Sequence, residues 1–139
     1  MVQLILGQKG KGKTKFLLDK VNEAITGTNG NIVFLDKNTK HMYELNNKIR
    51  LIDVSSYELL NEDEFVGFIS GILSQDHDLE QMYFDCFLQI SGVGDGDVTP
   101  VLKRLQTVSE NFGVDFYICI SRDKSEISAD FSDNILVAL

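Results

Sequence analysis

Gly7-Gln8-Lys9-Gly10-Lys11-Gly12-Lys13-Thr14 is the stretch that decides how this sequence folds, and its spacing is G-x-x-x-x-G-K-[ST]. A short apolar run, Val2–Leu6, comes directly before it and suits a buried parallel strand. The segment after it has helical periodicity, with apolar residues at Phe16, Leu17, Val21, Ala24 and Ile25. Strand, glycine-rich loop and helix, in this order, form the context in which the spacing has structural meaning.

The residue types of this loop, which has the form of a P-loop or Walker A motif, suit the binding of phosphate. Gly7 and Gly12 can adopt positive φ at little cost, so the loop can curve around an anion with its N–H groups pointing inward. The positive end of the following helix adds to the field. In such a motif Lys13 supplies charge to the β and γ phosphates, and the Thr14 hydroxyl binds Mg²⁺. We therefore predict that residues 7–14 bind a nucleotide, ATP, together with Mg²⁺.

Three further lysines lie within the motif or directly after it, and the motif does not require them. Lys9 and Lys11 lie inside the loop, so we expect them to touch phosphate, whereas Lys15 is expected to be a solvated surface charge.

Charge is distributed unevenly along the chain. The net charge of the 139 residues is −8, but residues 1–20 alone carry +4 and residues 21–139 carry −12. A cationic pocket in an acidic body favours a small anionic ligand and disfavours a nucleic-acid track, which needs an extended basic face. We expect no nucleic-acid partner.

Length and hydropathy indicate one domain, 1–139, with one core. No apolar stretch is long enough to span a membrane, and the first strand leaves no room for a signal peptide, so we expect a cytoplasmic protein without membrane contact.

Cys86 and Cys119 lie in apolar runs and are expected to be reduced core thiols. His41 and His77 are expected in solvated loops rather than at a metal.

Apolar runs predict further strands, at residues 32–35, 49–54, 82–85, 114–120 and 135–138. Helices are expected after the glycine loop, from the N-cap Asn61 with Glu64 three residues on, and from Thr99 as N-cap with Pro100 next. Residues 37–47 fit a short hairpin or a loop with one helical turn. Strands that alternate with helices predict an α/β fold with a mostly parallel sheet covered by helices on both faces.

Asp85 ends the apolar segment Met82-Tyr83-Phe84, which is the form of a Walker B element. Its carboxylate would hold the Mg²⁺ shell near Thr14. Asp36 ends the strand at 32–35 in the same way and competes for this role. We favour Asp85 as the metal residue, because it comes later in the chain with a helix between.

Two other segments are expected near the site. The loop 91–97 is rich in glycine and acid and follows the Asp85 strand directly, so it either gates the site or is a mobile surface connection. If the strand at 114–120 lies between the glycine-loop strand and the Asp85 strand, Ser121 and Arg122 would come close to the phosphates.

The stretch Gly7–Thr14 and, more weakly, Asp85 give this chain a resemblance to the P-loop NTPase superfamily. More narrowly, the chain resembles the short single-domain ATP-binding proteins often labelled as twitching-motility-type ATPases. The resemblance implies a RecA-like strand order, with the 114–120 strand between those of Gly7 and Asp85. It implies no motor function, because the additional domain and the acidic and histidine motifs of pilus-retraction motors are not found. The Asn-Lys-x-Asp and Asp-x-x-Gly signatures of GTPases are also missing.

RecA-like ATPases usually place a glutamate beside the Walker B aspartate to orient the attacking water, but Cys86 stands there in this chain. We therefore predict a Mg²⁺-nucleotide-binding switch or regulatory module with slow or partner-dependent hydrolysis, and an unidentified protein partner is possible. The alternative is an autonomous small ATPase. A small-molecule kinase using Arg104 and Arg122 is the least favoured.

Overall fold

A computed structural model describes all 139 residues of the chain. Six strands form one sheet: β1 (Val2–Leu6), β2 (Asn31–Asp36), β3 (Arg50–Asp53), β4 (Leu79–Phe84), β5 (Asp115–Ile120) and β6 (Ile135–Ala138). The order across the sheet is β3-β2-β4-β5-β1-β6, and every neighbouring pair is parallel. The α/β prediction is confirmed, and so is the placement of β5 between β1 and β4.

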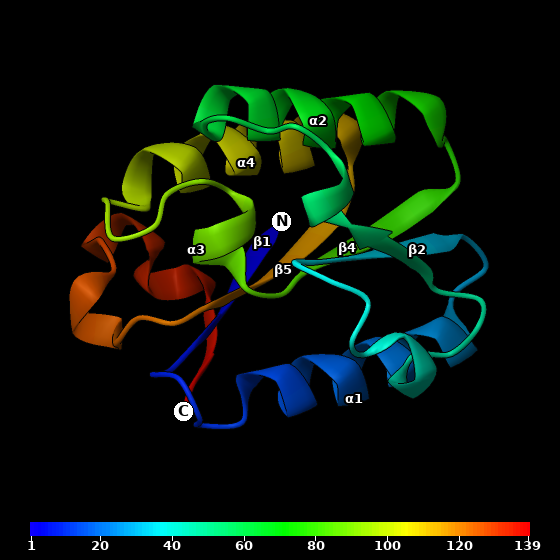
Figure 1. Cartoon of the computed structure of the whole chain (residues 1–139), viewed down its shortest axis with the longest axis horizontal. Helices are drawn as coiled ribbons and strands as arrows, with labels where there is room; N and C mark the ends of the chain where they lie inside the picture. The colour runs from blue at the N-terminus through cyan, green and yellow to red at the C-terminus, as the bar shows by residue number, and fades with distance from the viewer.

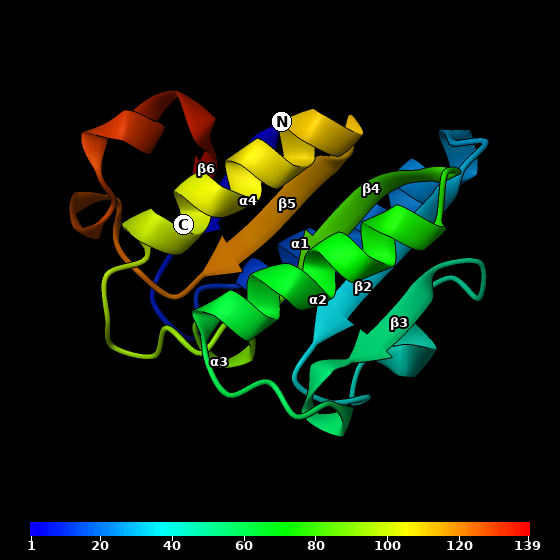
Figure 2. The same cartoon turned by 90° about the horizontal axis from the view of Figure 1, so that it is seen from above.

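Helices cover both faces of this sheet, as Figures 1 and 2 show. One face carries α1 (Lys13–Gly27), and the other carries α2 (Glu62–Gln75) and α4 (Thr99–Phe112). The remaining helical turns are short: α3 (Phe87–Ile90), η1 (Met42–Glu44), η2 (Val54–Ser56), η3 (Lys124–Glu126) and η4 (Ala129–Asn134). None of the helices is long and apolar enough to cross a membrane.

The helix ends follow local chemistry. Asn61 caps α2, with its side-chain oxygen accepting a hydrogen bond from the Glu64 N–H at 2.9 Å. The N-cap predicted at Thr99 is wrong by one position, because Val98 is the N-cap of α4 and Thr99 is its first helical residue. Gly113 ends α4 in the left-handed conformation, at φ 66°.

The core has two parts, one on each face of the sheet. A cluster of 25 buried residues lies under α2 and α4, and a cluster of 12 lies under α1. Alternation along β1 assigns Leu4 and Leu6 to the first cluster and Ile5 to the second. Because all strands are parallel, their carboxyl ends meet at one edge, and the loops that follow β1, β2, β4 and β5 gather there.

Candidate functional site

The glycine loop leads from β1 into α1 and leaves the start of that helix bare. Gly10 and Gly12 have φ of 87° and 89°, which only glycine adopts readily, and Gly12 is the N-cap of α1. No side chain caps this end and no acidic residue lies in the first turn. The N–H groups of the first turn have no intrahelical acceptor, so they are available to an anion.

Gly7 and Lys13 hold the two ends of the loop in place. The Gly7 N–H donates to the Arg122 carbonyl at 3.1 Å, and a Cβ at Gly7 would lie 3.0 Å from the Leu139 carbonyl. Lys13 is only 8% exposed, and its Nζ donates to the Gln8 carbonyl at 3.0 Å. The ammonium group therefore lies folded across the loop, next to the bare helix end.

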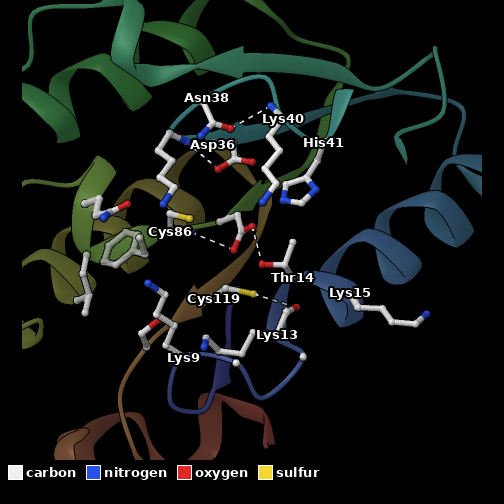
Figure 3. Close-up of a pocket in the computed structure, with 18 of the residues that line it drawn as sticks. Lys9, Lys13, Thr14, Lys15, Asp36, Asn38, Lys40, His41, Cys86 and Cys119 are labelled. Carbon is white, nitrogen blue, oxygen red and sulfur yellow. Dashed lines mark hydrogen bonds between the residues drawn. The ribbon is translucent and has the colours of Figure 1, made fainter. Parts of the chain in front are cut away.

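A hydrogen bond joins the first turn of α1 to the residue that follows β4. The Thr14 hydroxyl donates to Asp85 Oδ2 at 3.0 Å, and Asp85 Oδ1 accepts from the Cys86 N–H at 3.0 Å (Figure 3). Asp85 is 3% exposed. The two residues predicted from the sequence to bind the metal thus lie together. The hydroxyl oxygen of Thr14 keeps a lone pair that can coordinate a metal ion.

A second carboxylate, Asp36 at the end of β2, lies beside Asp85. Donor atoms of Asp36, His41 and Asp85 all lie within 4.8 Å of one another. Asp36 is 1% exposed; its Oδ1 accepts from the Lys37 N–H at 2.7 Å, while its Oδ2 is buried without any hydrogen-bond partner. Burial raises the pKa of Asp36 against the lowering effect of the Lys37 hydrogen bond, and the charge of Asp85 raises it further.

These groups line a cavity of about 620 Å³ at the carboxyl edge of the sheet. Five of the eight loop residues are among its walls: Lys9, Gly10, Gly12, Lys13 and Thr14. Gly7, Gln8 and Lys11 are not. Lys15 borders the cavity but bonds Asp19 at 2.8 Å, and its amino group points away from Thr14 in Figure 3. The opposite wall is Asp36, Lys37, Asn38, Lys40 and His41, so the cavity is rich in cationic groups.

The two residues after β5 diverge. Ser121 lines the cavity, but Arg122 does not, because its guanidinium donates to the carbonyls of Gly94 and Gly96 at 2.9 and 2.7 Å. The expectation that Arg122 would lie near a phosphate is therefore not supported. It fixes the 91–97 loop instead, and Gly94 and Asp95 of that loop border the cavity.

Cys86 follows Asp85 with a strained backbone, at φ 52°, and is the only non-glycine residue with positive φ. Burial raises the pKa of its thiol to about 11, and the charges of Asp85 and Asp36 add to the effect. A neutral thiol is a weak hydrogen-bond partner, so Cys86 does not supply the water-orienting group that a glutamate would supply.

The chain matches no protein-family model, and no curated protein matches its sequence. One similar solved structure is that of the pCW3 conjugation coupling protein TcpA, in a monomer form with ATPγS. It is 11% identical, with a TM-score of 0.48, and the match covers 96% of this chain and 46% of that protein. This chain therefore spans less than half of that protein's length. The sequence identity and the TM-score are both too low to indicate a shared function. A function must therefore be argued from the residues of the cavity.

Asp36 and His41 are the cavity residues whose grouping the sequence did not reveal. Asp36 was considered only as a rival metal residue, and His41 was expected in a solvated loop. The available signal was the strand-end position of Asp36, because β2 lies next to β4 and both strands end at the same edge. Nothing in the sequence indicated that the loop after β2 returns His41 to within reach of both carboxylates.

Proposed function

We propose that residues 1–139 act as a nucleotide-binding domain that takes ATP with Mg²⁺ and works as a switch or regulatory module. Hydrolysis in this proposal is slow or depends on a partner protein. The observation that carries it is the Thr14–Asp85 hydrogen bond of 3.0 Å, formed directly beside the bare N-terminus of α1. A hydroxyl and a strand-end carboxylate in this relation are the parts that hold Mg²⁺ beside a bound triphosphate.

The shape of the loop supports the same ligand. A Cβ built on Gly10 or Gly12 meets no atom within 4 Å, so the space in front of these glycines is open to a phosphate group. Lys13 would move from the Gln8 carbonyl to the β and γ phosphates, where its charge is better compensated. Bound Mg²⁺ would supply charge neutralisation at these phosphates, held by Thr14 and Asp85.

An autonomous ATPase is the second candidate, and one observation favours it. Asp36 presents a buried carboxylate oxygen without a partner next to Asp85, where it could accept a hydrogen bond from an attacking water. Its side chain is one methylene shorter than that of glutamate, so its carboxylate reaches less far toward a bound phosphate. This shorter reach favours slow turnover over fast, autonomous hydrolysis.

The small-molecule kinase interpretation receives no support from the arginines on which it depended. Arg104 pairs with Asp63 at 2.5 Å, and Arg122 bonds the 91–97 loop. Neither lines the cavity.

A thermal-shift experiment with millimolar ATP tests the proposal, with and without Mg²⁺. Ligand at one hundred times its dissociation constant stabilises a fold by about 2.7 kcal/mol, so we expect a clear rise in melting temperature that needs Mg²⁺. GTP in a parallel series measures the preference for the base. No shift with either nucleotide, at concentrations up to several millimolar, would contradict the proposal.

A further inference from the structure

We propose that Asp36, His41 and Asp85 form a binding site for a divalent transition-metal ion that is occupied without nucleotide. This site goes beyond the Thr14–Asp85 pair, because it adds an imidazole and a second carboxylate from the loop after β2. Its three donor atoms lie within 4.8 Å of one another. A tetrahedral ion with bonds of about 2.1 Å needs donors roughly 3.4 Å apart, so the side chains would close by about an ångström.

The buried Oδ2 atom of Asp36, which has no hydrogen-bond partner, is the observation that indicates a missing ligand. Oδ2 is the one buried side-chain oxygen or nitrogen of this chain without a hydrogen-bond partner, and the residue is 99% buried. The Cys86 thiol lies beside this carboxylate and lowers its pKa, but it forms no hydrogen bond of good geometry with Oδ2. Such a group costs free energy unless something compensates it. Asp36 borders the cavity, whose volume of about 620 Å³ is large enough for an ion with bound water.

Lysines border the same cavity, including Lys37 and Lys40, but none of them forms an ion pair with the two carboxylates. None of the ion pairs of the chain involves Asp36 or Asp85, although the two carboxylates are neighbours. Lys13, which also lines the cavity, directs its Nζ to the Gln8 carbonyl instead. Two adjacent buried carboxylates without a cation are unfavourable, and a divalent ion would neutralise both.

Glu44 orients the imidazole of His41, which is the third donor of the proposed site. The Nδ1 atom of His41 lies 3.3 Å from Glu44 Oε1, in the η1 turn three residues on. When the Glu44 carboxylate accepts a hydrogen bond from Nδ1–H, it holds the imidazole in the tautomer whose Nε2 has a free lone pair, and metal-binding histidines commonly have such an outer partner. Figure 3 shows the His41 ring on the same side of the cavity as Asp36, above Thr14.

The donor set selects the kind of ion. Mg²⁺ prefers oxygen ligands and keeps most of its waters, whereas one imidazole with two carboxylates suits Mn²⁺, Co²⁺ or Zn²⁺. Three protein donors leave a position open for water. We therefore expect affinity to rise from Mg²⁺ through Mn²⁺ to Co²⁺, in the usual order for nitrogen-containing sites.

Cobalt provides the direct test, because its visible spectrum reports its ligands. The full chain is stripped with a chelator and titrated with Co²⁺ without nucleotide, with calorimetry in parallel. We expect a single equivalent to bind with d–d bands of low coordination number, and excess Mg²⁺ to compete only weakly. His41→Gln should weaken Co²⁺ binding at least tenfold, and Asp36→Asn likewise.

His77→Gln is the matched control, because His77 is exposed and outside the cavity. The proposal is overturned if wild type binds no Co²⁺, or if His77→Gln weakens binding as much as His41→Gln does. Because His41 lies in a surface loop, its variant should fold even if Asp36→Asn does not. Lys13→Ala separates this site from the nucleotide site: it should lose ATP and keep Co²⁺, so that failure of one proposal leaves the other testable.

Discussion

Thr14 and Asp85, 71 positions apart in the sequence, are joined by a hydrogen bond of 3.0 Å at the carboxyl edge of the sheet. The bond exists because β5 separates β1 from β4, which places the start of α1 opposite the end of β4. This bond is the reason why we propose Asp85, in preference to Asp36, for the metal role in nucleotide binding.

Asp85→Asn should therefore impair Mg²⁺-dependent ATP binding more than Asp36→Asn does. Removing the charge beside the Thr14 hydroxyl is expected to raise the Mg²⁺ concentration needed for binding by about 10- to 100-fold. Matched Mg²⁺ titrations at fixed ATP measure this. If Asp36→Asn has the larger effect, the role belongs to the end of β2.

Asp36→Asn should stabilise the metal-free protein at neutral pH. Burial raises the pKa of Asp36 when the chain folds, so the stability contributed by its protonated form is full below the unfolded pKa and declines as pH rises through the folded pKa. Asparagine stays neutral, so the variant's melting temperature should exceed that of wild type at pH 7, by less at pH 4. Melts in chelator across this range give the comparison, and a lower melting temperature for the variant at pH 7 would refute the account.

Phe65 anchors α2 to the sheet, and its truncation should be severe. The side chain is fully buried and packs edge-to-face against Phe84 and Phe87. Phe65→Ala should reduce the free energy of unfolding by about 3–5 kcal/mol, as for other large-to-small core changes. Phe112→Ala is the control, because Phe112 is 45% exposed and should change it by less than about 0.5 kcal/mol. Equal losses in urea denaturation would show that this part of the core is misassigned.

Purified protein should hydrolyse ATP well below a typical enzyme rate of about 10 s⁻¹. Cys86 cannot orient water, and Asp36 reaches less far than glutamate would. A phosphate-release assay with Lys13→Ala as background control measures the rate. Fast hydrolysis by wild type that disappears in Lys13→Ala would favour the autonomous ATPase instead.

Much of this architecture could be predicted from the sequence, because its signals are local. The glycine spacing at residues 7–14, the capping pair Asn61 and Glu64, and the apolar strand runs each depend on neighbouring residues. The strand order followed from the resemblance to RecA-like ATPases, and β5 does lie between β1 and β4.

The far wall of the cavity could not be predicted, because tertiary contacts form it. His41 reaches the carboxylates only after the loop following β2 folds back over the sheet edge, and polar loops carry no periodicity. Arg122 was expected beside phosphate because of its strand-end position, but carbonyls of the 91–97 loop bind its guanidinium. Such loop-to-loop contacts have no signature in a single sequence.

The most direct test of the central claim is a calorimetric titration of the protein with ATP in the presence of Mg²⁺. Wild type should bind, and Lys13→Ala should bind about 10- to 100-fold more weakly, because a buried charge-assisted contact to phosphate is lost. Lys11→Ala, at an exposed loop position outside the cavity wall, should bind nearly as wild type does. No binding by wild type, or equal binding by wild type and Lys13→Ala, would contradict the assignment of residues 7–14 as a nucleotide site.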